Sequence, residues 1–531
     1  MQALNQNRQF ANLLLITALL FGLIIRLAAP LNAQGPVNDG GLFFQMTRDL
    51  QANHFALPAY TTYNHIPIPF AYPPLGFYLT GLIQGLTDIS LITLFTYLPA
   101  ILSALAILAF YFLAHQLLQD NLKASLAALF YALLPRSFDW SIMGGGITRA
   151  PAIVLSFLTL AFSYRLLTRK QSKYILPAAI CASLLALTHP EITFQTAFSV
   201  LILVFFFLRD WKSIFHSITV IALTLTLTST WWFTVLTRHG PEPFQAALLA
   251  HPRDLGLSLL YLFQFNLSGE NILTPIAILS LIGLVLDFRR RDFFLPAWIG
   301  LSFIGDPRAA PFASLTPMIL LAVKGFEAVL TGLGLPAQFG NGFRSRTARN
   351  ILLGLVAYVF MSGLIASMWL GNEFRILSEE REALNWITQN TPKDSRFLLL
   401  TGDAALSDPL SEWFPALTGR ISIVTVQGHE WTLVSNLILS MRDYNAAQDC
   451  LKRDVSCIAN RNFDYLYIRR VRPQREGNIE RQVSLLEESL QESSQYSVVY
   501  DSPEAIIFAR GKPTSNAIGP AINNHMAVWS P

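Results

Sequence analysis

Long apolar runs, separated by short polar stretches, recur through the first 370 residues of the chain. A run of roughly 15–25 apolar residues is long enough to cross a bilayer as an α-helix. The pattern predicts about eleven such helices, near residues 11–31, 91–118, 123–138, 147–167, 174–190, 193–208, 213–236, 271–288, 293–305, 311–331 and 351–370. Two shorter runs, 73–86 and 255–267, are expected to be interfacial or re-entrant helices, with full spans as the alternative.

The pattern changes after Leu370, where charged residues become common and no run reaches spanning length. Helical periodicity predicts amphipathic helices near residues 377–389, 435–450 and 479–491. Short apolar segments near residues 396–401, 421–426, 465–469, 496–500 and 505–509 are typical of strands. We therefore expect two parts, a transmembrane domain over residues 1–370 and an α/β domain over residues 371–531.

Composition supports this division. Of the 531 residues, 52% are hydrophobic and 14% are charged, whereas a soluble domain carries about 25% charged residues. The fold class is thus a polytopic α-helical membrane protein with a C-terminal soluble α/β domain. No metal-ligand spacing, phosphate loop or basic run suited to nucleic acid occurs in the sequence.

Lysine and arginine are concentrated in one alternate set of loops. Because cytoplasmic loops carry the excess of positive charge, this set lies inside and the amino terminus with it. The first loop, residues 32–90, and the C-terminal domain then lie outside a cell membrane that the chain crosses many times. Cys450 and Cys457 fall in that outer domain, where an oxidising compartment lets them pair.

Asp39 stands just beyond the first apolar run, where the membrane meets water. Small turn-forming residues surround it, Pro36, Asn38, Gly40 and Gly41. A carboxylate fixed in such a turn is a candidate general base. An Asx-turn or helix cap without chemistry is the alternative.

Single arginines stand beside turns on the outer side, where topology does not explain positive charge. Arg149 follows three glycines, and Arg308 follows a Gly-Asp-Pro turn. With Arg136 and Arg253 they are candidates for an anion site such as a phosphate site. Contacts with lipid headgroups or local ion pairs are the alternative.

Other candidate binding residues lie at bends near the outer surface. His189 and Glu191 flank Pro190 between two short spans, so they should sit at the outer interface or slightly below it. A proline-terminated helix with Glu191 paired to an arginine is the alternative. Tyr72 belongs to the bent aromatic segment of residues 70–78.

The order of these features resembles the GT-C superfamily of membrane glycosyltransferases. An early outer Asp, a Tyr-Pro-Pro-Leu segment, a many-helix bundle and an outer domain follow one span, as in protein O-mannosyltransferases, lipid A aminoarabinose transferases and oligosaccharyltransferases. The loop of residues 144–149 is similar to that of bacterial membrane proteins described as pyruvoyl-tetrahydropterin-synthase-related. The segment 412–420 is also similar to these proteins.

The resemblance implies a function. Asp39 matches the superfamily's catalytic carboxylate and would act as general base in an inverting transfer. The donor would be a polyprenyl-phosphate sugar and the acceptor a lipid, glycan or protein. Arg149 and Arg308 would hold the phosphate, and His189 and Glu191 would line a pocket. Many members carry a second acid after the first, but Gly40 stands here, so no cofactor is assigned and a divalent metal is left open.

A multi-span transporter or lipid-handling protein without catalysis is the rival class. Transporters place polar groups near the midplane and often contain internal repeats. Here no repeat is found, and the ionisable residues gather at the outer ends of the helices. The pattern favours an enzyme that works at one face, although a transferase relative without activity remains a further alternative.

The charge bias makes a testable prediction about topology. A reporter that is active only in the cytoplasm, fused after Pro531, should be silent because residues 371–531 lie outside. The same reporter fused after Lys170, in a predicted inner loop, is the matched control and should be active. An active reporter at Pro531 would place the Asp39 loop and the C-terminal domain on different sides or both inside.

Overall fold

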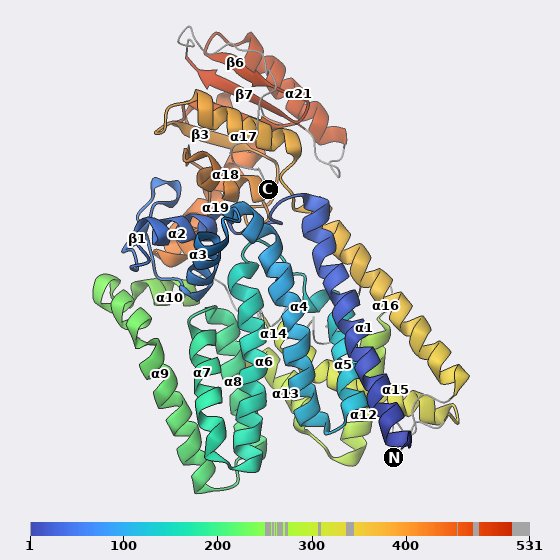
Figure 1. The fold of residues 1–531 in the computed structure, drawn as a ribbon. Coiled ribbons are helices and arrows are strands. Elements are labelled where there is room, and N and C mark those ends of the chain that lie inside the picture. The colour runs from blue at the N-terminus through green and yellow to red at the C-terminus, as the bar shows by residue number, and fades with distance from the viewer. Residues whose placement is uncertain are drawn as a thin grey trace.

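The computed structural model describes residues 2–249, 274–305, 309–335, 345–453, 455–470 and 477–511, together with residues 256, 260, 262, 269 and 270. A bundle of long helices forms one end of the molecule and a small sheet covered by helices forms the other (Figure 1). Between them lies the loop that follows the first helix.

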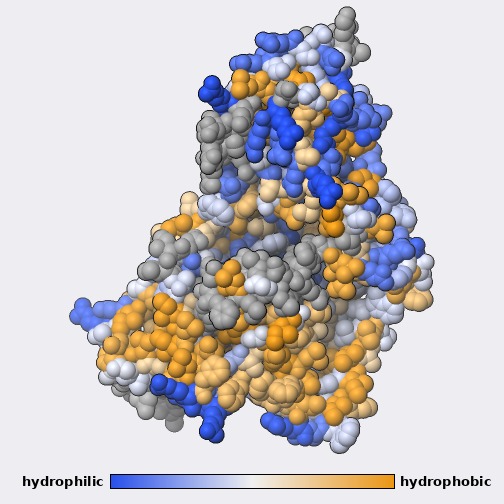
Figure 2. All heavy atoms as spheres, turned by 180° about the vertical axis from the view of Figure 1, so that it is seen from behind, coloured by the Kyte–Doolittle hydropathy of each residue, from blue (hydrophilic) through white to orange (hydrophobic). Residues whose placement is uncertain are grey.

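The bundle contains the predicted apolar runs as helices. They are α1 (Gln2–Ala33), α4 (Leu91–Leu118), α5 (Asn121–Leu133), α6 (Gly146–Arg169), α7 (Ile175–Ala186), α8 (Pro190–Phe207), α9 (Trp211–His239), α12 (Pro275–Arg290), α13 (Phe294–Gly305), α14 (Ala310–Ala313), α15 (Leu315–Gly332) and α16 (Arg346–Glu373). By length and composition, 7 of the described helices are able to cross a membrane, and α5, α7 and α13 are shorter apolar helices. Figure 2 shows apolar side chains gathered over this end and hydrophilic ones over the other.

Two helices end earlier than the apolar pattern predicted, and in both cases a proline follows the observed end. The predicted run 123–138 ends as a helix at Leu133, because Leu134 precedes Pro135 and is extended, with ψ 131°. A residue before proline is disfavoured in the helical region. Likewise α7 ends at Ala186, and Pro190 begins α8 with His189 as its N-cap. The shortened ends leave room for loops between the helices.

The loop between α1 and α4 is more structured than its turn residues indicated. It contains α2 (Gly41–Ala52), the short strands β1 (Tyr60–Thr61) and β2 (Ile68–Pro69), the 3-10 helix η1 (Tyr63–His65), and α3 (Leu75–Thr87). The helix α3 has 13 residues, which agrees with an interfacial or re-entrant segment. The other such segment, 255–267, falls almost wholly outside the described residues.

The C-terminal part holds a five-stranded sheet in the order β4-β3-β5-β7-β6. The strands are β3 (Arg396–Leu400), β4 (Ile421–Ser422), β5 (Tyr465–Arg469), β6 (Tyr496–Asp501) and β7 (Ala505–Arg510). The first three pair in parallel, and β7 runs antiparallel to both β5 and β6. The predicted helices are α17 (Ser378–Asn390), α19 (Val434–Gln448) and α21 (Gly477–Glu492), and α18 (Pro409–Thr418) is an additional one.

Two hydrophobic cores hold the described residues together. One lies among the helices of the bundle. The second joins the sheet to the loop between α1 and α4, so that Leu42, Phe44 and Phe70 are buried with Phe397 and Trp413. This loop and the C-terminal domain therefore share one hydrophobic core.

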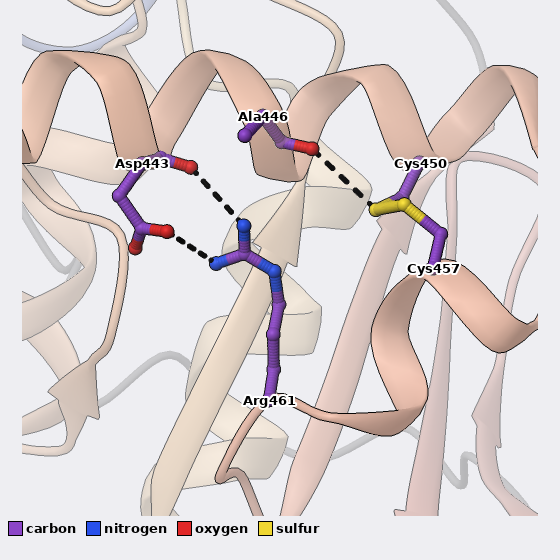
Figure 3. The surroundings of a disulfide bond; sticks show 5 residues. All are labelled: Asp443, Ala446, Cys450, Cys457 and Arg461. Atoms are coloured by element: carbon purple, nitrogen blue, oxygen red, sulfur yellow. Dashed lines mark hydrogen bonds and ion pairs between the residues drawn. A yellow bond between two sulfur atoms is a disulfide. The ribbon is translucent and has the colours of Figure 1, made fainter.

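A disulfide bond closes a small loop in the C-terminal domain, as the sequence predicted. Cys450 and Cys457 are bonded, with their Cα atoms 5.5 Å apart. Beside them Arg461 forms an ion pair of 2.9 Å with Asp443 on α19, which fixes the segment after the second cysteine (Figure 3). The remaining cysteine, Cys181, is free and buried.

Thiol counting tests this bond. Denatured but unreduced protein should react with a maleimide at Cys181 alone, and reduction should expose all three thiols. A Cys181→Ser variant is the matched control, because it should show no reactive thiol before reduction. Three thiols in unreduced wild-type protein would contradict the disulfide.

Candidate active site

Asp39 lies in a turn whose backbone is joined to the start of α6. The N–H of Gly144 donates to the carbonyl of Val37 at 2.9 Å, and the N–H of Gly145 donates to Asp39 Oδ1 at 2.9 Å. The other carboxylate oxygen, Oδ2, forms an ion pair with Nη2 of Arg149 in the first turn of α6. A helix N-terminus and a guanidinium thus stabilise the same negative charge.

The glycines before α6 are required by this close approach. A Cβ on Gly144 would lie 2.0 Å from the carbonyl oxygen of Asp39, and one on Gly145 would lie 2.9 Å from its Oδ2. A side chain at Gly144 would force the two backbones apart, and one at Gly145 would displace the Asp39 carboxylate. The glycine run that precedes Arg149 in the sequence therefore packs directly against Asp39.

Arg149 is held from its other side by Trp140. Its Nη1 donates to the carbonyl of Trp140 at 3.0 Å, and its guanidinium lies 4.8 Å from the centre of the indole ring. The sequence indicated an isolated cation, whereas the structure gives Arg149 an acidic partner in Asp39. The Arg149 side chain as a whole is 13% exposed.

The C-terminal domain covers the Asp39 turn through α18. Glu412 Oε1 accepts a hydrogen bond of 2.7 Å from the N–H of Gly40, and Trp413 Nε1 donates to the carbonyl of Asn38 at 2.9 Å. Both side chains are buried. The sequence marked this segment as similar to relatives and predicted no role for it beyond closing over the cavity, because nothing in the spacing tells which distant loop it meets.

A cavity of about 230 Å³ opens beside Arg149. Four of its lining residues, Arg136, Arg149, His189 and Glu191, are ones that the sequence had singled out separately. The rest of its wall is largely apolar and comes mainly from α6, α8, α13 and α14–α15, with Phe157, Leu160, Ile192, Trp298, Phe312 and Leu315. The cavity thus combines two arginines with a largely apolar wall.

His189 and Glu191 lie at the start of α8. His189 caps this helix, its Nδ1 accepting from the N–H of Ile192 at 3.3 Å, and Glu191 follows in the first turn. The ring of Tyr72 lies 6.1 Å from that of His189, and its hydroxyl is 3.3 Å from Thr148 Oγ1, next to Arg149 in α6. Tyr72 is not among the residues that line the cavity.

Arg136 has contacts of its own at the cavity wall. Its Nη1 lies 3.6 Å from Asp139 Oδ2, and its guanidinium lies 5.2 Å from the centre of the Phe312 ring. Burial raises the pKa of Asp139 to about 6, although Arg136 acts in the opposite direction. Arg253 and Arg308 lie outside the described residues, so their phosphate-binding role stays a prediction.

The residues around Asp39 do not fit a metal site built on paired carboxylates. Position 40 is glycine, and both oxygens of Asp39 accept from Gly145 and Arg149. In the part of the chain that the structure describes, no group of three or more His, Cys, Asp or Glu side chains is placed to hold a metal ion. A cationic side chain stands where such an ion would balance Asp39.

Comparison with solved structures identifies the fold. ArnT from Cupriavidus metallidurans aligns over 96% of this chain and 99% of its own, at 13% identity and a TM-score of 0.57. Its complex with undecaprenyl phosphate gives a TM-score of 0.55 at 14% identity, over 96% of this chain and 98% of that one. The chain has the fold of the GT-C glycosyltransferases.

Other comparisons agree. An oligosaccharyltransferase from Archaeoglobus fulgidus, tethered to an acceptor peptide, aligns over 94% of this chain and 74% of its own, at 13% identity and a TM-score of 0.52. The arabinofuranosyltransferase AftD from Mycobacteria has a TM-score of 0.54 at 14% identity, over 94% of this chain and 40% of AftD. Residues 71–332 match the family model of the 6-pyruvoyl-tetrahydropterin synthase related domain, described as a membrane protein. No curated protein matches the chain by sequence.

Glu412 generates a pH-dependence prediction. Burial, with Asp39 nearby, raises the pKa of the Glu412 carboxyl to about 8. The folded protein therefore keeps a proton that the unfolded chain releases near its ordinary pKa of about 4.5. The retained proton favours the folded state, and its contribution to the free energy of unfolding is fully present at low pH. This contribution is lost as pH rises through about 8, at up to about 1.4 kcal/mol per pH unit.

Thermal unfolding of the detergent-solubilised protein between pH 5 and 9 tests the sign. The melting temperature of wild type should fall across this range more steeply than that of Glu412→Gln, which carries no titrating group. Glu492→Gln, at an exposed acid of α21, is the matched control and should keep the wild-type slope. Equal slopes for wild type and Glu412→Gln would mean that Glu412 is ionised throughout.

Proposed function

We propose that this protein transfers a sugar from a polyprenyl-phosphate-linked donor to a lipid, glycan or protein acceptor at the outer face of the membrane. Asp39 acts as the general base, and the anomeric centre is inverted. One observation carries this proposal: Asp39 forms an ion pair with Arg149, and Arg149 lines a largely apolar cavity together with Arg136.

The shape of the cavity suits a lipid phosphate. A polyprenyl chain requires an apolar path between helices, and its phosphate requires cations at the outer end. Arg149 and Arg136, which both line the cavity, meet the second requirement. The likeness to ArnT, solved with undecaprenyl phosphate, supports the same class of donor.

The Asp39–Arg149 pair suggests an order of events. Before the donor binds, Arg149 neutralises Asp39. A donor phosphate competes for the guanidinium, because a phosphate offers more acceptor oxygens than the single carboxylate oxygen that Arg149 now contacts. Asp39 then keeps the Gly145 N–H and regains an oxygen that is able to accept a proton.

The chemical step uses these two groups together. The acceptor hydroxyl oxygen attacks the anomeric carbon on the face opposite the phosphate, while Asp39 takes the hydroxyl proton. The bond from the anomeric carbon to the phosphate oxygen breaks, and its electron pair stays on the polyprenyl phosphate. Arg149 and Arg136 stabilise the charge that develops there. His189 and Glu191 line the space beside the sugar.

An outer location is supported by two independent features. The lysine and arginine bias places the Asp39 loop outside. The Cys450–Cys457 bond belongs to a domain that shares a hydrophobic core with that loop. Disulfides persist in oxidising compartments, which supports an outer location for both. Lipid-linked sugars are the donors available where nucleotide sugars are not.

The Asp39→Asn variant tests the base. Asparagine keeps the size and the ability to accept from Gly145 but removes the proton acceptor. Sugar transfer by the purified variant, measured with a radiolabelled lipid-linked donor pool, should fall about 100- to 10,000-fold. Asn is also a good turn residue, so expression and melting temperature should change little.

Matched variants separate the base from the donor site. Asp49→Asn changes an acid on α2 that is bonded to Thr61 and Thr62 instead of Arg149, and its transfer rate should stay within a few-fold of wild type. Arg149→Ala should weaken donor binding as well as transfer. Asp39→Asn with activity near that of wild type would remove Asp39 as the base.

A further inference from the structure

Asp39 is held on both sides by two successive residues of the C-terminal domain. The residue before it, Asn38, accepts a hydrogen bond of 2.9 Å from Trp413, and the residue after it, Gly40, donates one of 2.7 Å to Glu412. Neither contact involves Asp39 itself. Together they fix the peptide units from which its side chain projects.

The helix that carries these contacts is itself fixed. Asp408 caps α18 by accepting from the N–H of Ser411 at 3.1 Å, and its second oxygen accepts from Tyr444 at 2.7 Å. The carbonyl of Glu412 accepts from the hydroxyl of Tyr63 in the outer loop at 2.6 Å. The Glu412 carboxyl therefore has a defined position relative to both the sheet and the Asp39 turn.

The Gly40 bond controls a backbone conformation that few residues adopt. Gly40 has φ +119°, and the next residue, Gly41, lies so close to α18 that a Cβ would be 2.4 Å from the Glu412 carbonyl oxygen. A pair of adjacent glycines is intrinsically mobile. Without a fixed acceptor for its N–H, this turn would sample other conformations and move Asp39 away from Arg149.

We propose that Glu412 is a positioning residue of the transferase centre, whose carboxyl holds the Gly40 amide and thereby aims Asp39 at the acceptor hydroxyl. This inference rests on the function proposed above. It gives the C-terminal domain a direct part in catalysis. It also places the acid Glu412, from a distant segment, beside Asp39. The position directly after Asp39 is occupied by Gly40.

The charged groups around Glu412 favour a role in hydrogen bonding to Gly40 over a role in proton transfer. Asp39 faces it from the turn, Arg149 from α6, Glu430 from the 3-10 helix η5 (His429–Trp431), and the Tyr63 hydroxyl from η1. Two acids and a buried site oppose ionisation of Glu412. A carboxyl in this state keeps a carbonyl oxygen as an acceptor for Gly40, and an amide side chain is able to supply the same oxygen.

Two substitutions at Glu412 and one control separate positioning from simple domain docking. Glu412→Gln retains an acceptor oxygen, whereas Glu412→Ala removes it. Asn64→Ala is the matched control, because Asn64 joins the outer loop to the same domain through two hydrogen bonds with Ser422, at 2.8 and 2.9 Å. It loosens the same interface without touching the residues beside Asp39.

Steady-state kinetics give the first readout. Glu412→Ala should lower kcat about 100-fold while leaving the donor KM within a few-fold, since misplacement of a reacting group by about 1 Å costs that order. Glu412→Gln should restore kcat to within a few-fold of wild type. Asn64→Ala should lower the melting temperature but not kcat. A kcat loss in Asn64→Ala as large as in Glu412→Ala would overturn the proposal in favour of docking alone.

Hydrogen exchange gives a readout that does not depend on transferase activity. Peptides covering residues 36–50 should exchange faster in Glu412→Ala than in wild type, and at the wild-type rate in Glu412→Gln. Unchanged exchange in Glu412→Ala would overturn the positioning role even if transfer fell. Faster exchange in a protein whose wild type transfers no lipid-linked sugar would instead support the positioning of Asp39 and overturn the proposed function.

Discussion

A partly buried carboxylate has to be compensated, and the arrangement around Asp39 follows from that constraint. The charge is balanced by Arg149 and by a backbone amide at the start of α6. Both donors reach it only because the residues that separate the two backbones are glycines. The bend after α5, the start of α6 and the approach of α18 all serve to bring these groups to one place.

Much of the fold could be predicted from the sequence because helix periodicity and apolar length are local signals. The predicted bundle helices and the strands β3, β5, β6 and β7 lie where the pattern placed them. Prolines also carried information, although Pro135 ended α5 earlier than hydropathy alone indicated. The helices α2 and α18 were not predicted, since the first follows a glycine turn and the second contains Pro409 and Pro415.

The site was predictable in its members but not in its contacts. Asp39, Arg136, Arg149, His189 and Glu191 were each marked by an ionisable side chain at an outer turn, and the structure brings them to one neighbourhood. That Arg149 pairs with Asp39, and that Glu412 reaches Gly40, depends on tertiary packing across more than a hundred residues. No spacing rule in one sequence encodes such a distance. The Glu412–Trp413 segment resembled relatives in its sequence, but nothing in the sequence indicated which residues it would contact.

The shared core of the outer loop and the C-terminal domain has a consequence for biosynthesis. Gly40 and Glu412 are separated by 372 positions, and chains emerge from the ribosome amino terminus first. Leu42, Phe44 and Phe70 of the Asp39 loop therefore stay uncovered until the C-terminal part has been synthesised. Closing such a long-range contact is slow. Assembly of the Asp39 turn thus becomes one of the last steps of maturation, and an incompletely synthesised chain is left without it.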